Sequence, residues 1–220
     1  VGSKGNGNNI ANENYARELM QLFTIGLFQL NQDGTLVLDK NQNPIPTYDQ
    51  AVIADFAKVF TGWTYPTRPG VAPQRHNPAY YTGPMVAAAV NHDTSAKTLL
   101  NGFQVPAGQT AADDLKSALD NIFSHPNVGP FIATRLIQHL VTSNPSPAYV
   151  GRVAAVFNDD GSAGHLRGNL AVVIKAILLD PEAADVPTTM FGLPTTGGHL
   201  REPAFLIPAI LRALGAAVND

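Results

Sequence analysis

Cysteine is absent from this 220-residue chain, which excludes disulfide bonds and thiolate metal sites. No apolar run approaches 18 residues, so the sequence predicts no membrane-spanning helix. Charged residues make up only 14%, against a typical fraction of roughly 25%. The net charge is −3 and Lys and Arg form no cluster, so we expect no nucleic-acid partner.

The polar surface must come mainly from Asn, Gln, Ser, Thr and Gly, because charged residues are few. Such surfaces are common in exported proteins, so we expect a periplasmic or extracellular location. Residues 1–11 are rich in Gly and Asn and lack periodicity, which predicts a flexible N-terminal loop. The length fits one domain over 12–220. Because the chain opens with Val1 in such a loop, we expect it to be the C-terminal portion of a longer protein.

The hydrophobic pattern predicts a mainly α fold of six or seven helices with one small β-hairpin. Asp33-Gly34 between two apolar runs predicts the hairpin turn. We expect extended structure over 97–108, a capping box over 47–50, and a cap from Asn127. The helical pattern covers these segments: 13–25, 48–61, 111–123, 128–140, 147–157, 170–179 and 203–214. The helix over 170–179 is nearly all apolar and should be central.

The first helix carries an apolar stripe at i, i+4, i+7 and i+8, formed by Tyr15, Leu19, Leu22 and Phe23. Asn12 is placed to cap this helix, and Gly26 to stop it in a left-handed turn. Glu18 lies beside the stripe, at the edge of the face that we expect to be buried. A carboxylate in that position is either paired or functional.

Glu13, Arg17 and Glu18 are the first candidate catalytic group. Two carboxylates beside a guanidinium can act as general acid and base, because the cation sets their pKa values apart. The alternative is an arginine that bridges two acids and locks the helix against its neighbours.

His92, Asp93 and Lys97 are the second candidate catalytic group. A carboxylate that orients an imidazole is the supporting half of a hydrolytic triad. However, no G-x-S-x-G elbow is present to supply the nucleophile. The alternative is a turn in which Asp93 caps the N–H groups of Ser95 and Ala96 and Lys97 forms a salt bridge.

The segment 64–91 is a long, proline-rich loop that we expect to be ordered and functional. His76, Tyr80 and Tyr81 are its candidate substrate-binding residues, since tyrosine rings suit stacking on sugars or aromatic groups. The alternative is a crossover whose rings pack onto helices. Trp63, the only tryptophan, should belong to the core.

Asp39 to Asn43 resembles the opening of a calcium loop. Pro44 and Gln50 occupy the positions that need Gly and Glu, which rules out an EF-hand. An irregular Ca²⁺ site near Asp33 and Asp39 stays open. We predict no other metal and no cofactor.

Several separated motifs resemble those of the bacterial "domain of unknown function 1800" (DUF1800) family. They are N-E-N-Y-A-R-E-L-M-Q-L-F-T-I-G at 12–26, T-G-W at 61–63, N-H-D-x-x-x-K at 91–97, H-P-x-x-x-x-F-I-A-x-R-L at 125–136, L-L-D-P-E at 178–182 and R-E-P at 201–203. This resemblance implies a further helical region before the first motif, which would be a partner within the same protein. It also implies an association with a sulfatase-like partner of the DUF1501 type. It implies no particular reaction.

Two hypotheses follow. The first is an exported hydrolase-like enzyme, with its site near the first helix and the 64–97 loop. The second is a non-catalytic binding or assembly module, in which the charged motifs fasten loops to helices. The first requires accessible acids near His92, and the second requires charges that are saturated within the fold.

Overall fold

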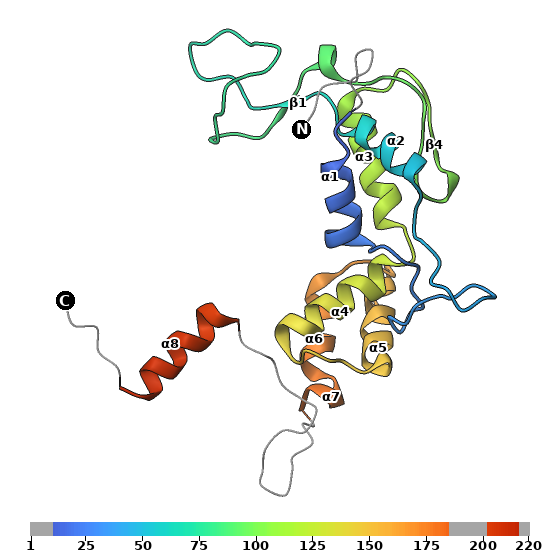
Figure 1. The fold of residues 1–220 in the computed structure, drawn as a ribbon, viewed down its shortest axis with the longest axis vertical. Helices are drawn as coiled ribbons and strands as arrows, with labels where there is room; N and C mark the ends of the chain where they lie inside the picture. The colour runs from blue at the N-terminus through green and yellow to red at the C-terminus, as the bar shows by residue number, and fades with distance from the viewer. Residues whose placement is uncertain (1–10, 185–201, 216–220) are drawn as a thin grey trace, which may run out of the picture. The chain divides into compact units, whose positions relative to one another are not determined.

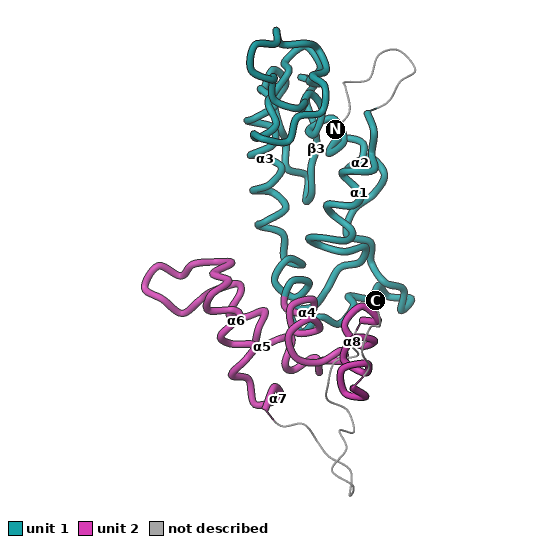
Figure 2. Tube along the Cα trace, turned by 90° about the vertical axis from the view of Figure 1, so that its left-hand side faces the viewer, with its two compact units in different colours: residues 1–132 teal, residues 133–220 magenta. Residues whose placement is uncertain are grey.

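The structure is a computed structural model that describes residues 11–184 and 202–215 (Figure 1). The mainly α fold is confirmed, with eight α-helices and two small antiparallel sheets in the described residues. The chain divides into two compact units, residues 1–132 and 133–220 (Figure 2). The single domain over 12–220 stays a prediction, because compact units need not fold independently. Residues 1–10 of the predicted N-terminal loop lie outside the described residues.

The first unit is built on α1 (Asn14–Glu18), a π-helix, η1 (Leu19–Thr24), α2 (Gln50–Val59) and α3 (Ala111–Phe123). α1 and α3 lie alongside α2 (Figures 1 and 2). Their facing sides form an apolar core that includes Ala16, Met20, Ile53, Phe56, Val59, Ala118 and Ile122. Burial of these faces, rather than helix propensity, stabilises the short helices.

The first helix buries a different face from the predicted one. Tyr15, Leu22 and Phe23 are 49%, 49% and 64% exposed, whereas Ala16 and Met20 are fully buried. The predicted stripe assumed α-helical geometry throughout. From Leu19 the chain forms π-helix, whose i→i+5 bonding advances each residue by a smaller angle and shifts the later side chains around the axis. The predicted stop is confirmed, since Gly26 has φ +75°.

Two short sheets flank the helices of this unit. β1 (Trp63–Thr64) pairs with β2 (Val86–Ala87) and closes the base of the loop over 65–85. β3 (Lys97–Thr98) pairs with β4 (Gln104–Val105), so the extended structure expected over 97–108 is present in these two strands but is interrupted by a turn over 100–102. Two 3₁₀ turns, η2 (Ala89–Asn91) and η3 (Leu100–Gly102), connect these strands to their neighbours. The loop over 65–85 projects away from the helices (Figure 1).

The predicted hairpin turn is present at Asp33-Gly34. Gly34 has φ +78°, and its N–H donates to the carbonyl of Asn31 at 3.0 Å. Leu30 and Leu36 form an isolated bridge across the turn. The pairing consists of isolated bridges rather than continuous strands, as expected for a short ribbon that cannot stabilise itself.

Three predicted helix caps are wrong in detail. The N-cap residue of α1 is Glu13 rather than Asn12, and the side chain of Glu13 makes no capping hydrogen bond. Asn12 Oδ1 accepts from the N–H of Asn14. Asp49 caps α2 by accepting from the N–H of Val52, in place of the expected capping box. The side chain of Asn127 instead binds the segment 25–30. In the first two cases a neighbouring residue takes the N-cap position, and in the third the side chain binds a segment that is distant in sequence.

The second unit contains α5 (Pro147–Asn158), α6 (Leu170–Leu179), α7 (Pro181–Ala184) and α8 (Pro203–Ala213). α4 (Val128–Leu140) runs through the boundary between the units. Tyr149 of α5 is buried, and its hydroxyl donates to the carbonyl of Ile177 at 2.6 Å. Burial of this phenol, with the nearby charges of Asp180 and Glu182, raises the pKa of Tyr149 to about 12.

The prediction that the helix over 170–179 is central is only half right. Val173 and Ile177 are fully buried against α5, but the opposite stripe of Leu170, Ile174 and Leu178 is exposed. α8 buries none of its residues. Among the described residues, no helix is both long enough and apolar enough to cross a membrane.

Candidate functional site

Glu13 and Arg17 form a network with Gln50, across the contact between α1 and α2. Arg17 Nη2 donates to Glu13 Oε2 at 2.8 Å and to Gln50 Oε1 at 2.6 Å. Gln50 Nε2 donates to Glu13 Oε1 at 2.8 Å. The hydrogen bond from Gln50 lowers the pKa of Glu13, against a smaller opposing effect of burial, and Arg17 lowers it further. A carboxylate with a lowered pKa stays ionised, so Glu13 is a poor general acid.

Glu18 does not belong to this network. Its side chain is exposed, and within the described part of the chain it makes no hydrogen bond or ion pair. The arginine therefore holds one of the two predicted acids, and the structure does not bring the three charges together as one catalytic group.

His92 is enclosed by the fold, with a side chain only 1% exposed. Its Nε2 lies 3.1 Å from Asp114 Oδ2, and its Nδ1 lies 3.0 Å from the carbonyl oxygen of Thr61. Both ring nitrogens are engaged and neither faces solvent. The imidazole therefore has no free nitrogen with which to take a proton from a substrate.

Lys97 is buried next to the same carboxylate. Its Nζ lies 2.7 Å from Asp114 Oδ2 and donates to the carbonyls of Asp93 and Ser95 at 2.7 and 2.8 Å. These three contacts match the three donors of an ammonium group. Lys97 is thus a saturated buried cation, and its carboxylate partner is Asp114 rather than Asp93.

Asp93 caps a turn, as the structural alternative predicted. Its Oδ1 accepts from the N–H of Ser95 at 2.9 Å and from the Ser95 hydroxyl at 2.6 Å. Partial burial tends to raise the pKa of Asp93, but these bonds and the charges of Lys97 and Lys58 lower it below its ordinary value. Asp93 does not orient the imidazole of His92, because Asp114 contacts that ring instead.

Asp114 is the central residue that the sequence interpretation missed. It is fully buried, and its second carboxylate oxygen has no hydrogen-bond partner in the described structure. A signal was available, since Asp114 shares a helical face with the buried Ala111, Ala118 and Ile122. An acid on an apolar helix face indicates a buried partner of opposite charge.

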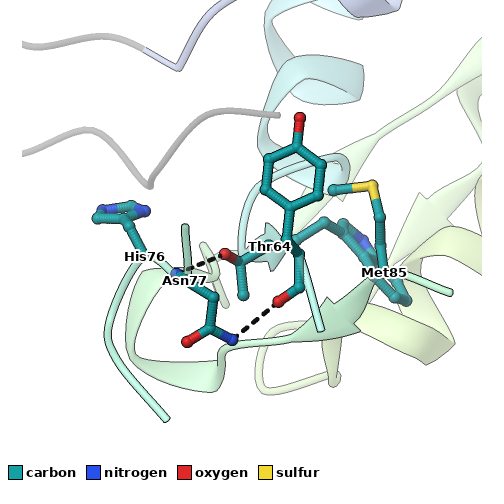
Figure 3. A pocket seen from close by; sticks show the side chains of 6 residues that line it. Thr64, His76, Asn77 and Met85 are labelled. Atoms are coloured by element: carbon teal, nitrogen blue, oxygen red, sulfur yellow. Dashed lines mark hydrogen bonds between the residues drawn. The ribbon is translucent and has the colours of Figure 1, made fainter. Parts of the chain in front are cut away.

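The long loop forms a pocket of about 340 Å³ over β1 (Figure 3). Thr64 and Asn77 lie in its middle, with His76 and Met85 on either side (Figure 3). The lining residues come from β1 and from two returns of the loop, and they are Trp63, Thr64, Tyr65, His76, Asn77 and Met85. The loop expected to be ordered over 64–91 thus has a pocket, and its base is closed by β1 and β2. That the loop is functional stays a prediction.

Asn77 holds this pocket together. Its N–H donates to Thr64 Oγ1 at 3.0 Å, and its side-chain amide donates to the carbonyl of Tyr65 at 2.8 Å (Figure 3). Its Oδ1 accepts from the N–H of Gln74 at 2.8 Å. One buried asparagine thus fixes both the strand and the returning loop.

The predicted substrate-binding residues fall in two places. His76 lines the pocket, whereas Tyr80 and Tyr81 are not among its lining residues. Tyr81 is 81% exposed and meets Tyr65 edge-on, with ring centroids 5.3 Å apart. The guanidinium of Arg68 lies 5.9 Å from the centroid of the Tyr80 ring. Tyr80 and Tyr81 therefore support the loop around the pocket.

Trp63 corrects another prediction. It is half-buried and lines the pocket instead of lying wholly in the core. Its indole N–H is buried and has no acceptor in the described residues. The helix α2 ends at Val59, and a turn over 60–62, with φ +86° at Gly62, leads into β1. The indole therefore emerges at the edge of the helical core rather than within it.

The buried charge cluster supports the strand that carries Trp63. The hydroxyl of Thr61 accepts from the N–H of Asp93 at 2.8 Å. A Cβ added at Gly62 would lie 2.9 Å from Cβ of His92, so the two segments are in close contact. The carbonyl of Gly62 also accepts from the N–H of Ala88 at 2.7 Å. His92 and its partners therefore fasten the start of β1.

The carboxylates considered for calcium serve turns. Asp33 Oδ1 accepts from the N–H and hydroxyl of Thr35 at 3.0 and 2.6 Å. Asp39 Oδ1 accepts from the N–H groups of Asn41 and Asn43, both at 2.8 Å. Over 11–184 and 202–215, no group of three or more His, Asp or Glu side chains could hold a metal ion.

The comparison with known families agrees with the motifs. The model of a family described as "Protein of unknown function (DUF1800)" matches residues 2–219. The chain therefore belongs to the DUF1800 family. No curated protein and no solved structure matches it.

Proposed function

We propose that this DUF1800 protein is a non-catalytic binding module, whose ligand site is the pocket over β1. The observation that carries the proposal is the contrast between its charged groups and its pocket. His92, Lys97 and Asp114 are buried and engaged with one another. The pocket is open, and the described residues that line it include no Asp, Glu, Lys or Arg.

The hydrolase hypothesis has less support. A general base must come within hydrogen-bond reach of its substrate, and the fold encloses His92 and Lys97. Glu13 is tied to Arg17 and Gln50. Of the predicted catalytic residues, Glu18 is the one that stays both exposed and unpaired in the described structure.

A hydrolase panel on the full chain tests the proposal. Esters, phosphate and sulfate esters, glycosides and peptides should show no turnover above buffer in the wild type. Glu18→Gln and the exposed control Asp120→Asn should behave identically. Turnover that Glu18→Gln abolishes, with an unchanged unfolding midpoint and full activity in Asp120→Asn, would replace the binding proposal with catalysis at Glu18.

Bacterial origin, export and assembly form part of the same proposal. The exposed Tyr15, Leu22 and Phe23 give α1 and η1 an apolar surface, of a kind that often contacts another chain segment. A helical region of the same protein, of the sort that the family resemblance implies, is the occupant we propose. A DUF1501-type protein is the alternative partner.

Hydrogen exchange on a longer form of the protein tests this contact. The amides around Leu22 should gain protection relative to the present chain, and Leu22→Ser should remove that gain. Leu119→Ser is the matched control, because Leu119 is similarly exposed on α3. Unchanged protection around Leu22 in the longer form, or a gain that appears only when a DUF1501-type protein is added, would contradict the intramolecular contact.

A further inference from the structure

We infer that the pocket over β1 binds a single uncharged sugar ring. This inference rests on the proposed function, because it names the ligand class of the same site. Three features of the pocket carry it: a lining without Asp, Glu, Lys or Arg among the described residues, an aromatic wall that is held in place, and a hydroxyl donor at Thr64.

The size and charge of the pocket restrict the ligand first. Its volume of about 340 Å³ is near the lower end of the range of roughly 300–1,000 Å³ typical of small-molecule sites. Among the described residues that line the pocket there is no Asp, Glu, Lys or Arg. A phosphate, carboxylate or ammonium ligand would enter without a counter-charge, which is unfavourable. A small neutral ligand fits best.

The aromatic wall of the pocket is held in place before any ligand arrives. The ring of Tyr65 meets Tyr81 nearly at right angles, with an interplanar angle of 84°. Its backbone carbonyl accepts from the side chain of Asn77 at 2.8 Å. Trp63 and Met85 extend the apolar lining. A fixed aromatic surface loses little conformational entropy on binding, and it suits the C–H face of a sugar ring.

The polar groups of the pocket favour a ring with hydroxyl groups over a purely apolar ring. Thr64 Oγ1 accepts from the N–H of Asn77, which leaves its own hydrogen available as a donor. A sugar hydroxyl accepts a hydrogen bond from this donor, whereas a hydrocarbon ring leaves it unsatisfied. An apolar face with a hydroxyl rim is the chemistry of a pyranose.

Titration of a ¹⁵N-labelled full chain with methyl glycosides tests the inference. Trp63 is the only tryptophan, so the single indole N–H resonance reports on this pocket alone. Methyl β-D-glucoside, methyl α-D-mannoside and N-acetylglucosamine are the probes. We expect at least one to shift the indole resonance saturably. Tyr65→Ala should weaken that binding by roughly tenfold, the scale of one lost aromatic contact.

Two further variants keep the test decisive. Met85→Ala changes an exposed lining residue, so it should fold normally and still weaken binding. Phe103→Ala is the control, because Phe103 is exposed but does not line the pocket. The inference about sugars is overturned if no glycoside binds while neutral aromatic fragments such as benzamide shift the indole; the pocket then remains a binding site. If neither class shifts it, both this inference and the proposed function fail.

Discussion

Lys97 Nζ lies 2.7 Å from Asp114 Oδ2, and neither side chain reaches solvent. This ion pair joins the turn after His92 to α3, and His92 in turn contacts the segment that leads into β1. The charged motif N-H-D-x-x-x-K thus serves the architecture around the pocket. Its residues fasten the segments that hold Trp63.

Breaking this pair should strongly destabilise the chain. Lys97→Met leaves Asp114 with only His92 as a partner and leaves the carbonyls of Asp93 and Ser95 without their donor. Losing one partner of a buried ion pair typically lowers the free energy of unfolding by about 3–5 kcal/mol. Urea unfolding followed by circular dichroism measures the change.

Lys116→Met is the control for that variant, because the Lys116–Asp120 pair is exposed. An exposed pair contributes under about 1 kcal/mol, so this variant should remain close to the wild type. Equal effects of the two substitutions would show that the buried cluster contributes no more than a surface pair.

Gly62 should not tolerate a side chain. Its φ is +86°, and a Cβ there would lie 2.9 Å from Cβ and 3.0 Å from Cα of His92. Gly62→Ala therefore combines left-handed strain with a backbone clash. Gly70→Ala is a matched control, because Gly70 has φ +76° and nothing within 4 Å of the added Cβ.

Left-handed strain alone should destabilise Gly70→Ala by about 1–2 kcal/mol. In thermal unfolding, Gly62→Ala should lose clearly more stability than Gly70→Ala does. The indole resonance of Trp63 should also shift in Gly62→Ala, because the clash displaces the residue that precedes Trp63. Equal losses of stability in the two alanine variants would contradict the close contact between Gly62 and His92.

Asp180 should make the second unit sensitive to acid. Its Oδ2 and Oδ1 accept from Arg152 Nε and Nη2, both at 2.8 Å. These bonds lower the pKa of Asp180, against an opposing effect of burial. Because the folded pKa lies below the unfolded value of about 3.9, the stabilisation is present above that value and is lost as the pH falls through the folded pKa.

Unfolding measured from roughly pH 6 down to pH 2 tests this linkage. Asp180→Asn should be less stable than the wild type at neutral pH, and the difference should narrow as the pH falls. Asp120→Asn alters an exposed ion pair, so its stability should change with pH in the same way as that of the wild type. A constant gap between Asp180→Asn and the wild type over the whole range would contradict the lowered pKa.

Much of the fold followed from local pattern. The helices over 111–123 and 147–157, the turn at Asp33-Gly34 and the stop at Gly26 depend on neighbours in sequence, and the structure has all of them. The caps at Thr110 and Ser146 are also local. Such features are readable because the competing partners lie within a few residues.

The errors came where distant residues compete. Gln50 was expected to cap its own helix, but it binds Glu13, 37 residues earlier. Asn127 was expected to cap a helix, but it binds Ile25 and Phe28, about a hundred residues earlier. A π-helix changed which face of the first helix is buried. No local pattern encodes these choices, because they depend on which segments the fold brings together.

The candidate site was predicted in part. The long aromatic loop was singled out from its sequence, and the structure has a pocket there that His76 lines. Its role in binding stays a prediction. Asn77 and Met85 were missed, because nothing near them in sequence marks them as partners of β1. Asp114 was missed although its place on an apolar helix face gave a usable signal.

The central claim is that ligands bind at the pocket over β1 and not at the charged first helix. Mapping amide and indole shifts of the ¹⁵N-labelled chain against a library of neutral ring fragments and glycosides tests it most directly. The account predicts saturable shifts that cluster at Trp63, Tyr65 and Asn77 and that weaken in Tyr65→Ala. Shifts that cluster instead at Glu13, Arg17 and Glu18, and that survive Tyr65→Ala, would contradict it.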